Sequence, residues 1–169
     1  MATFVLVHGA FHGAWCWFKL TPELEKRGHV ATALNLPGAG DDPTPVATVT
    51  LEDCARRIAD VVSATSEPVL LLAHSLGGVP ATLAAEMVPE HLRRLIYLSA
   101  FVPKNGDAFV NIRSYKRYPV NPGPPHFAYS DDRRTITAIP ELVRPRWYND
   151  CSEADIEFAG LEKKKDGNA

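Results

Sequence analysis

One stretch near the middle of the chain constrains the fold more than any other. Residues 69–72 are a valine and three leucines, a run typical of a short strand buried on both faces. A turn centred on Ser75 follows at once, and residues 81–87 are then rich in good helix formers. Strand and helix backbones nearly touch at such a turn, so the positions two before and two after the serine must be small. Ala73 and Gly77 meet this requirement, and the stretch predicts a sharp strand-to-helix elbow.

Such an elbow has a chemical use. It lifts a serine hydroxyl clear of the sheet, where a substrate carbonyl can reach it. The usual pattern has glycine at both flanking positions, so Ala73 is a mild departure that keeps the steric requirement. Taken alone, the stretch also fits an ordinary glycine-containing turn with an incidental serine.

The start of the chain carries a second signal. Residues 3–7 predict another buried strand, and the loop after it, residues 8–15, reads HGAFHGAW. Acyl transfer through a serine creates a tetrahedral oxyanion, which needs preorganised N–H donors. One donor normally comes from the residue after the nucleophile, here Leu76, and the other from a His-Gly loop after an earlier strand. Ala10 is the expected second donor, with Phe11 as its alternative. The two signals together favour the serine as a nucleophile.

Several segments of the chain share a resemblance to one superfamily; they are residues 8–17, 36–40, 73–78 and 98–103. They resemble the α/β hydrolases, and most of all the group of small methyl esterases and hydroxynitrile lyases that includes plant salicylate-binding methyl esterases and bacterial relatives. The resemblance covers most of the chain, up to about residue 158. It implies that a catalytic acid and then a histidine follow the serine, on strands and helices that family members add later in the chain. This sequence lacks the expected acid and histidine segments.

The order of the predicted elements indicates an α/β fold. Strands are expected at residues 3–7, 30–36, 68–73 and 95–100, and helices between them at residues 17–27, 51–64 and 78–88. This alternation implies a mostly parallel, doubly wound sheet with helices on both faces. The prediction is therefore a sheet of the α/β-hydrolase type with a lid insert and without the C-terminal strands. A sheet ending at the fourth strand would expose an unpaired edge, so homo-oligomers through that edge are expected.

The chain divides into three predicted regions. Residues 1–103 form the N-terminal part of the hydrolase core, residues 104–161 a lid or cap, and residues 162–169 a charged tail. In the cap, a hairpin is expected within residues 127–137. A single helical turn is expected at residues 140–143 before Pro145 interrupts it. A short helix over residues 152–159 would open at a Ser152 cap and close at Gly160.

Candidates for the acid and the base are weak. Asp107 follows the fourth strand at the catalytic edge and is the best available acid, and His126 in the cap could fold over the serine as a base. His8, His12 and His74 lie in or beside the two motif loops, where hydrogen bonds that shape those loops are the favoured interpretation. His29 and His91 are placed at the opposite edge of the sheet.

Composition excludes several other classes. A formal net charge of −2 gives no general attraction to nucleic acid or to an anionic membrane surface, and no run approaches the ~20 apolar residues that span a bilayer. Cys16, Cys54 and Cys151 are odd in number and lack zinc-like spacing, so we expect free thiols, no metal and no cofactor. With no visible signal peptide, this predicts a reducing compartment, the cytoplasm. Cys16 is a poor candidate nucleophile because Ser75 occupies the elbow.

These observations favour a serine hydrolase that acts on small carboxylic esters through an acyl-enzyme at Ser75. The missing acid and histidine segments predict that this activity is impaired. Phe11, Trp17 and Phe101 are expected to line the substrate pocket, although aromatic residues at these positions fit a core equally well. One alternative is a hydroxynitrile lyase of the same group. Gly9 speaks against it, because serine-dependent plant lyases of the group carry threonine there. A second alternative is a non-catalytic remnant that binds a small ligand or a partner.

Overall fold

The core of the fold is a parallel sheet whose strands run β2-β1-β3-β4 across it. In this computed structural model, residues 1–107, 127–132 and 135–165 are described. The strands are β1 (Thr3–Val7), β2 (Val30–Leu34), β3 (Val69–His74) and β4 (Leu92–Leu98). All three pairings are parallel, with Val5 opposite Thr32 on one side and Leu71 on the other. This confirms the predicted α/β architecture.

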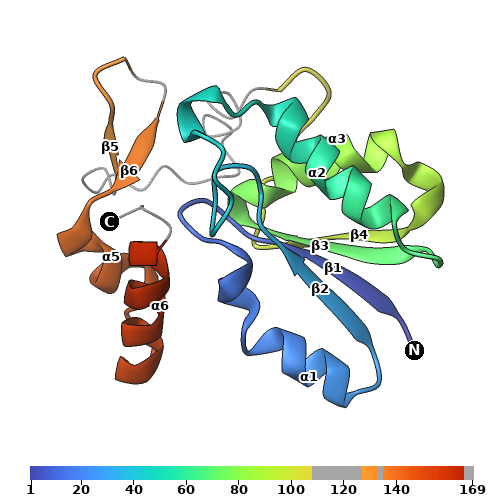
Figure 1. Cartoon of the computed structure of the whole chain (residues 1–169), viewed down its shortest axis with the longest axis horizontal. Coiled ribbons are helices and arrows are strands. Elements are labelled where there is room, and N and C mark those ends of the chain that lie inside the picture. The colour runs from blue at the N-terminus through green and yellow to red at the C-terminus, as the bar shows by residue number, and fades with distance from the viewer. Residues whose placement is uncertain (108–126, 133–134, 166–169) are drawn as a thin grey trace.

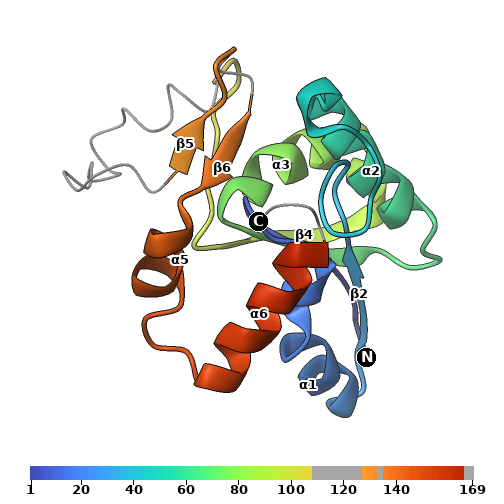
Figure 2. The same cartoon turned by 60° about the vertical axis from the view of Figure 1, so that its left-hand side comes forward.

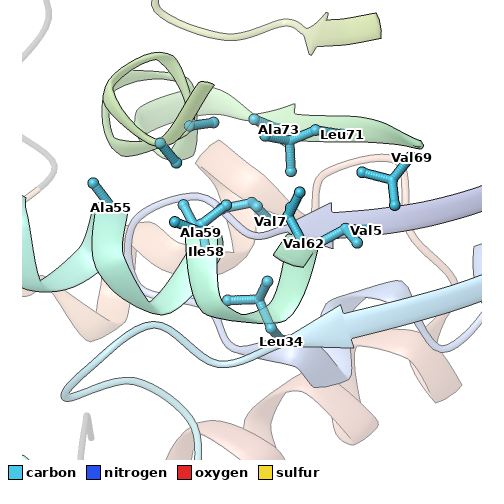
Figure 3. Close-up of a cluster of buried hydrophobic side chains, with 12 residues drawn as sticks. Val5, Val7, Leu34, Ala55, Ile58, Ala59, Val62, Val69, Leu71 and Ala73 are labelled. Carbon is cyan, nitrogen blue, oxygen red and sulfur yellow. The ribbon is translucent and has the colours of Figure 1, made fainter. Parts of the chain in front are cut away.

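Helices cover both faces of the sheet (Figure 1). α2 (Leu51–Ser63) and α3 (Gly78–Met87) pack together on one face, and α1 (Leu20–Lys26) lies on the other. Short 3-10 turns occupy the joints: η1 (Ala14–Trp17), η2 (Val46–Thr48), η3 (Ser75–Gly77) and η4 (Pro89–His91). The main core fills the space between the sheet and α2 with α3, where Val7, Ile58 and Leu71 are completely buried (Figure 3).

Local hydrogen bonds explain where α2 and α1 begin. Thr50 caps α2 as a capping box with Asp53, each side chain bonding the other residue's backbone N–H. α1 begins at Leu20, three residues later than expected. The reason is that the N–H groups of Cys16 and Phe18 bond to carbonyls three residues back, which winds residues 14–17 into the tighter 3-10 form.

The bounds of β2 and β4 also differ from the predictions. β2 ends at Leu34, because the N–H of Leu36 leaves the sheet and donates to the His8 ring. β4 begins at Leu92, three residues early, although Arg93 and Arg94 at its start are exposed. Backbone pairing with β3 therefore extends past the apolar run that marked the strand in the sequence.

The cap packs against one end of the core (Figure 2). Its β5 (Phe127–Tyr129) and β6 (Ile136–Ala138) form the expected antiparallel hairpin. α5 (Pro140–Trp147) runs through Pro145, so the expectation of a single turn was wrong. The proline removes one N–H, but Tyr148 donates to the Arg144 carbonyl across it and completes the helix.

The last helix is also longer than predicted. α6 (Glu153–Lys165) begins at the expected Ser152 cap, whose hydroxyl oxygen accepts the Asp155 N–H. It does not close at Gly160, which lies exposed within the helix. Residues 162–165 of the predicted tail therefore belong to α6. Among the described residues, no helix has the length and apolar character that a bilayer crossing requires.

Candidate active site

Ser75 occupies the junction between β3 and the helical run that leads into α3. Its φ is +51°, in the left-handed region that non-glycine residues rarely enter. Close backbone contacts hold it there. A Cβ on Gly77 would collide with the His8 carbonyl oxygen, and one on Gly78 with the Phe101 carbonyl oxygen. The Phe101 N–H donates to the Ser75 carbonyl at 3.0 Å. The serine thus stands on the sharp elbow that the sequence predicts.

The loop after β1 lies directly against this elbow. A Cβ built on Gly9 would be 2.9 Å from the Ser75 Cβ, closer than real Cβ atoms approach other atoms. Only a glycine lets the loop backbone come this near to the serine. The two predicted motif loops therefore meet at the carboxyl edge of the sheet, where ligands bind in folds of this type.

Two histidines hydrogen bond to carbonyl groups of this loop. His8 is buried, its Nδ1 donates to the Gly9 carbonyl at 2.8 Å, and its Nε2 accepts the Leu36 N–H at 3.2 Å. These two bonds require a neutral ring, and burial lowers the pKa of His8 accordingly. His12 donates from Nδ1 to the Ala10 carbonyl at 2.8 Å. Both rings shape the loop, as the favoured interpretation expected.

The predicted oxyanion donors lie beside the serine. Leu76 is at the start of the helical run, where N–H groups have no acceptor within the helix. Ala10 is in the loop that Gly9 brings onto the elbow, and both residues line the same cavity. Phe11, the alternative donor, has a φ of +62°, so its backbone is also held in an uncommon conformation. The placement fits an oxyanion site made from these amides, and that role stays a prediction.

A cavity of about 600 Å³ opens next to these amides. Its walls come from the first loop, the loop after β2, the start of α2, the elbow residues after Ser75, and Thr135 and Ile136 of the cap. The walls are mainly apolar, and Val46 and Leu51 expose large side chains at its rim. A small apolar molecule with one polar group fits such a space.

The aromatic residues predicted to line the pocket separate into two groups. Phe11 lines the cavity. Trp17 and Phe101 are not among its lining residues. Trp17 is 6% exposed and meets the His74 ring edge-on, which places it in the core. Phe101 supports the elbow through its backbone.

The structure also shows where the described acid and base candidates lie relative to Ser75. None of His8, His12, His29, His74 and His91 hydrogen bonds to the Ser75 hydroxyl, and His126 lies outside the described residues. Asp107 lines the cavity, and its carboxylate accepts the Lys104 N–H at 2.5 Å. Burial raises the pKa of Cys16 to about 12, which disfavours the thiolate form that a nucleophile needs. Within the described part of the chain, no group of side chains is arranged to hold a metal ion.

Sequence reasoning missed the group that fixes the second wall of the cavity. Asp42 accepts the N–H groups of Gly38 and Thr44, each at 3.0 Å, and pairs with Arg57 of α2 at 2.9 Å. Hydrogen bonds from Thr44, and then from Gly38 and Arg57, hold the pKa of Asp42 well below its usual range. The aspartate among glycine and proline residues was the available signal, because such side chains often bond to the backbone of their own turn.

Known proteins resemble this chain in both sequence and fold. A match to the alpha/beta hydrolase family spans residues 4–164. The chain belongs to that family. It is 33% identical over 166 residues to an alpha-hydroxynitrile lyase of Arabidopsis thaliana and 34% identical over 166 residues to salicylic acid-binding protein 2 of Nicotiana tabacum. These matches cover 94% and 92% of this chain.

Solved structures agree with the fold. The crystal structure of polyneuridine aldehyde esterase superposes with a TM-score of 0.80 at 27% identity, covering 100% of this chain and 73% of that chain. The chain spans 64% of the length of the lyase and of the salicylic acid-binding protein. The predicted superfamily, and its esterase and hydroxynitrile lyase group, are thereby confirmed.

Proposed function

We propose that this protein is a serine hydrolase that cleaves small carboxylic esters through an acyl-enzyme at Ser75. The observation that carries the proposal is the contact between Gly9 and the elbow, which brings the first loop's amides beside the serine. Several relatives are named methylesterases or esterases, which supports the reaction class.

The reaction would proceed in two halves. The Ser75 oxygen attacks the ester carbonyl while its proton passes to a base outside the described residues, for which His126 is the candidate in this chain. The oxyanion accepts hydrogen bonds from the N–H groups of Ala10 and Leu76. Collapse of this intermediate expels the alcohol, which takes up the proton. Water then attacks the acyl-enzyme by the same route and releases the acid.

The cavity indicates the class of ester. Its volume of about 600 Å³ and its mainly apolar walls suit a small ester with an aromatic or aliphatic body. Phe11 supplies an aromatic wall next to the amides. The ester group would lie at the elbow end and the apolar body toward Val46 and Leu51.

Substitution of the serine tests the proposal. Ser75→Ala should abolish hydrolysis of p-nitrophenyl acetate above the background without protein, because it removes the nucleophile of the proposed reaction. Ser63→Ala, at the exposed end of α2, is the matched control and should keep the full rate. Equal rates for the wild type and Ser75→Ala would remove the serine from the mechanism.

A lyase acting on cyanohydrins is the second candidate. The observation that favours it is the similarity to the Arabidopsis lyase over 94% of this chain. Release of cyanide from mandelonitrile, lost in Ser75→Ala, would establish it. A protein that neither hydrolyses esters nor releases cyanide, and whose serine is not labelled by a fluorophosphonate probe, would instead be the non-catalytic remnant.

A further inference from the structure

Two consecutive residues at the end of helix α5 contact the first loop. The Trp147 ring stacks on the Phe11 ring, with centroids 5.1 Å apart and planes 21° from parallel. The next residue, Tyr148, contacts the next loop residue, since its hydroxyl lies 2.7 Å from the His12 Nε2. These contacts join positions 136 residues apart in the chain.

The direction of the hydrogen bonds follows from the groups involved. A carbonyl oxygen only accepts, so the Nδ1 of His12 carries the hydrogen that it donates to Ala10. In a neutral ring the Nε2 is then an acceptor, and the Tyr148 hydroxyl donates to it. Burial raises the pKa of Tyr148, so that hydroxyl keeps its proton. The result is a chain of bonds from Tyr148 through His12 to the Ala10 carbonyl.

That carbonyl belongs to the peptide whose N–H is that of Phe11. In a trans peptide the C=O and N–H groups point in opposite directions, so fixing one fixes the other. The His8 bond to the Gly9 carbonyl does the same for the N–H of Ala10. The two histidine bonds therefore set both peptide planes that flank the Ala10 α-carbon, and only the His12 bond is tied to the cap, through Tyr148.

We propose that Tyr148 is a positioning residue that acts through His12 to align the amides of the first loop, so that docking of α5 and readiness of the oxyanion site are linked. The inference rests on the proposed function for its catalytic consequence, but the alignment itself is a property of the folded chain. α6 makes its own contacts with η1 and its flanks, through Phe158 on Phe18 and Asp155 on Lys19. Loss of the tyrosine hydroxyl should therefore loosen the loop without releasing the cap.

The experiment compares Tyr148→Phe with Tyr97→Phe in the full chain. Both changes remove one hydroxyl from a partly buried bond of similar length, 2.7 Å to His12 and 2.6 Å to Thr82. Amide hydrogen exchange at Ala10 and Phe11 is followed by NMR, together with the ring nitrogen signals of His12. We expect the wild-type ring to be neutral with its hydrogen on Nδ1. Exchange at Phe11 should be about tenfold faster in Tyr148→Phe and unchanged in Tyr97→Phe, in line with loss of one hydrogen bond.

The catalytic arm measures the rate of fluorophosphonate labelling of Ser75 and the kcat for p-nitrophenyl acetate. Tyr148→Phe should lower both by about tenfold with little change in KM, because the released Phe11 peptide shares the Ala10 α-carbon with the peptide that carries the oxyanion donor, and that donor acts in the transition state. Unchanged exchange in Tyr148→Phe, or an effect equal to that of Tyr97→Phe, would overturn the inference. A wild-type chain that neither labels nor turns over would refute the proposed function alone, because the exchange measurement decides the alignment without any reaction.

Discussion

At the scale of single residues, backbone strain gathers at one place in the molecule. Phe11, Ser75 and Ser99 are the non-glycine residues with positive φ among those described, and each lies after a strand at the carboxyl edge of the sheet. Such conformations persist only where the surroundings enforce them. At Gly77 and Gly78 the enforcing contacts are backbone to backbone, and Gly9 lies against the Ser75 Cβ. The strain therefore marks the same site that the cavity and the elbow mark.

The contact at Gly77 gives a prediction for stability. In Gly77→Ala the new methyl group would overlap the His8 carbonyl oxygen, which is backbone and cannot rotate away. We expect a loss of about 1–3 kcal/mol in the free energy of unfolding, measured by urea denaturation. Gly160→Ala is the matched control. Its methyl group meets nothing within 4 Å on an exposed helix, so it should be stabilising by up to about 1 kcal/mol. The same sign for both changes would contradict the close approach.

The three cysteines should differ in reactivity. Burial raises the pKa of Cys16 to about 12 and that of Cys54 to about 11, whereas Cys151 is exposed. Because only the thiolate reacts, iodoacetamide at about pH 8 should modify Cys151 first, as read by mass spectrometry of peptides. Faster modification of Cys16 would show that its side chain is not buried.

At the scale of elements, the loop after β2 is held as a unit by one ion pair. The Asp42 carboxylate accepts the N–H groups of Gly38 and Thr44. Arg57 of α2 pairs with this carboxylate and also donates to the Asn35 carbonyl. Residues 36–39 of this loop form one wall of the cavity. A helix on one face of the sheet thus sets the shape of a site at its edge.

The pair gives a pH dependence with a defined sign. Hydrogen bonds lower the pKa of Asp42 in the folded protein, so its stabilising effect is complete above the unfolded value of about 3.9 and fades as pH falls toward the folded value. Asp42→Asn should lower the free energy of unfolding by about 1–3 kcal/mol at neutral pH. This deficit should shrink steadily below about pH 4. A deficit that stays constant through that range, followed by urea denaturation, would show that the carboxylate charge is not involved.

Elements that rest on local signals were predictable from the sequence. The buried runs of β1 and β3, the Thr50 capping box and the glycine-flanked elbow each depend on neighbours along the chain. Contacts between distant segments were not. The sequence around Tyr148 does not predict its bond to His12, and the sequence around Pro145 does not predict that α5 continues past the proline. The base for Ser75 could not be assigned either, because a histidine's distance from the serine depends on how the cap folds over it.

At the scale of the whole molecule, β4 is an edge strand of the sheet that the described residues form. Leu92, Leu95, Ile96 and Tyr97 of this strand are only partly buried, and Leu98 is 45% exposed. Arg93 and Arg94 place charges on the first half of the strand only. A strand edge protected by charge over half its length offers its other half for pairing with a second chain. We therefore propose that the protein self-associates through the second half of β4.

Light scattering coupled to size-exclusion chromatography tests this association. The apparent mass should rise with protein concentration above the 18.5 kDa of one chain. Leu98→Lys should suppress the rise, because a charge at the open end of the edge strand opposes a second strand. Val30→Lys is the matched control. Val30 is 49% exposed on β2, the opposite edge strand, so the same change there should leave the association intact. Suppression by Val30→Lys alone would move the contact to the β2 edge, and a constant mass of one chain at all concentrations would exclude both edges.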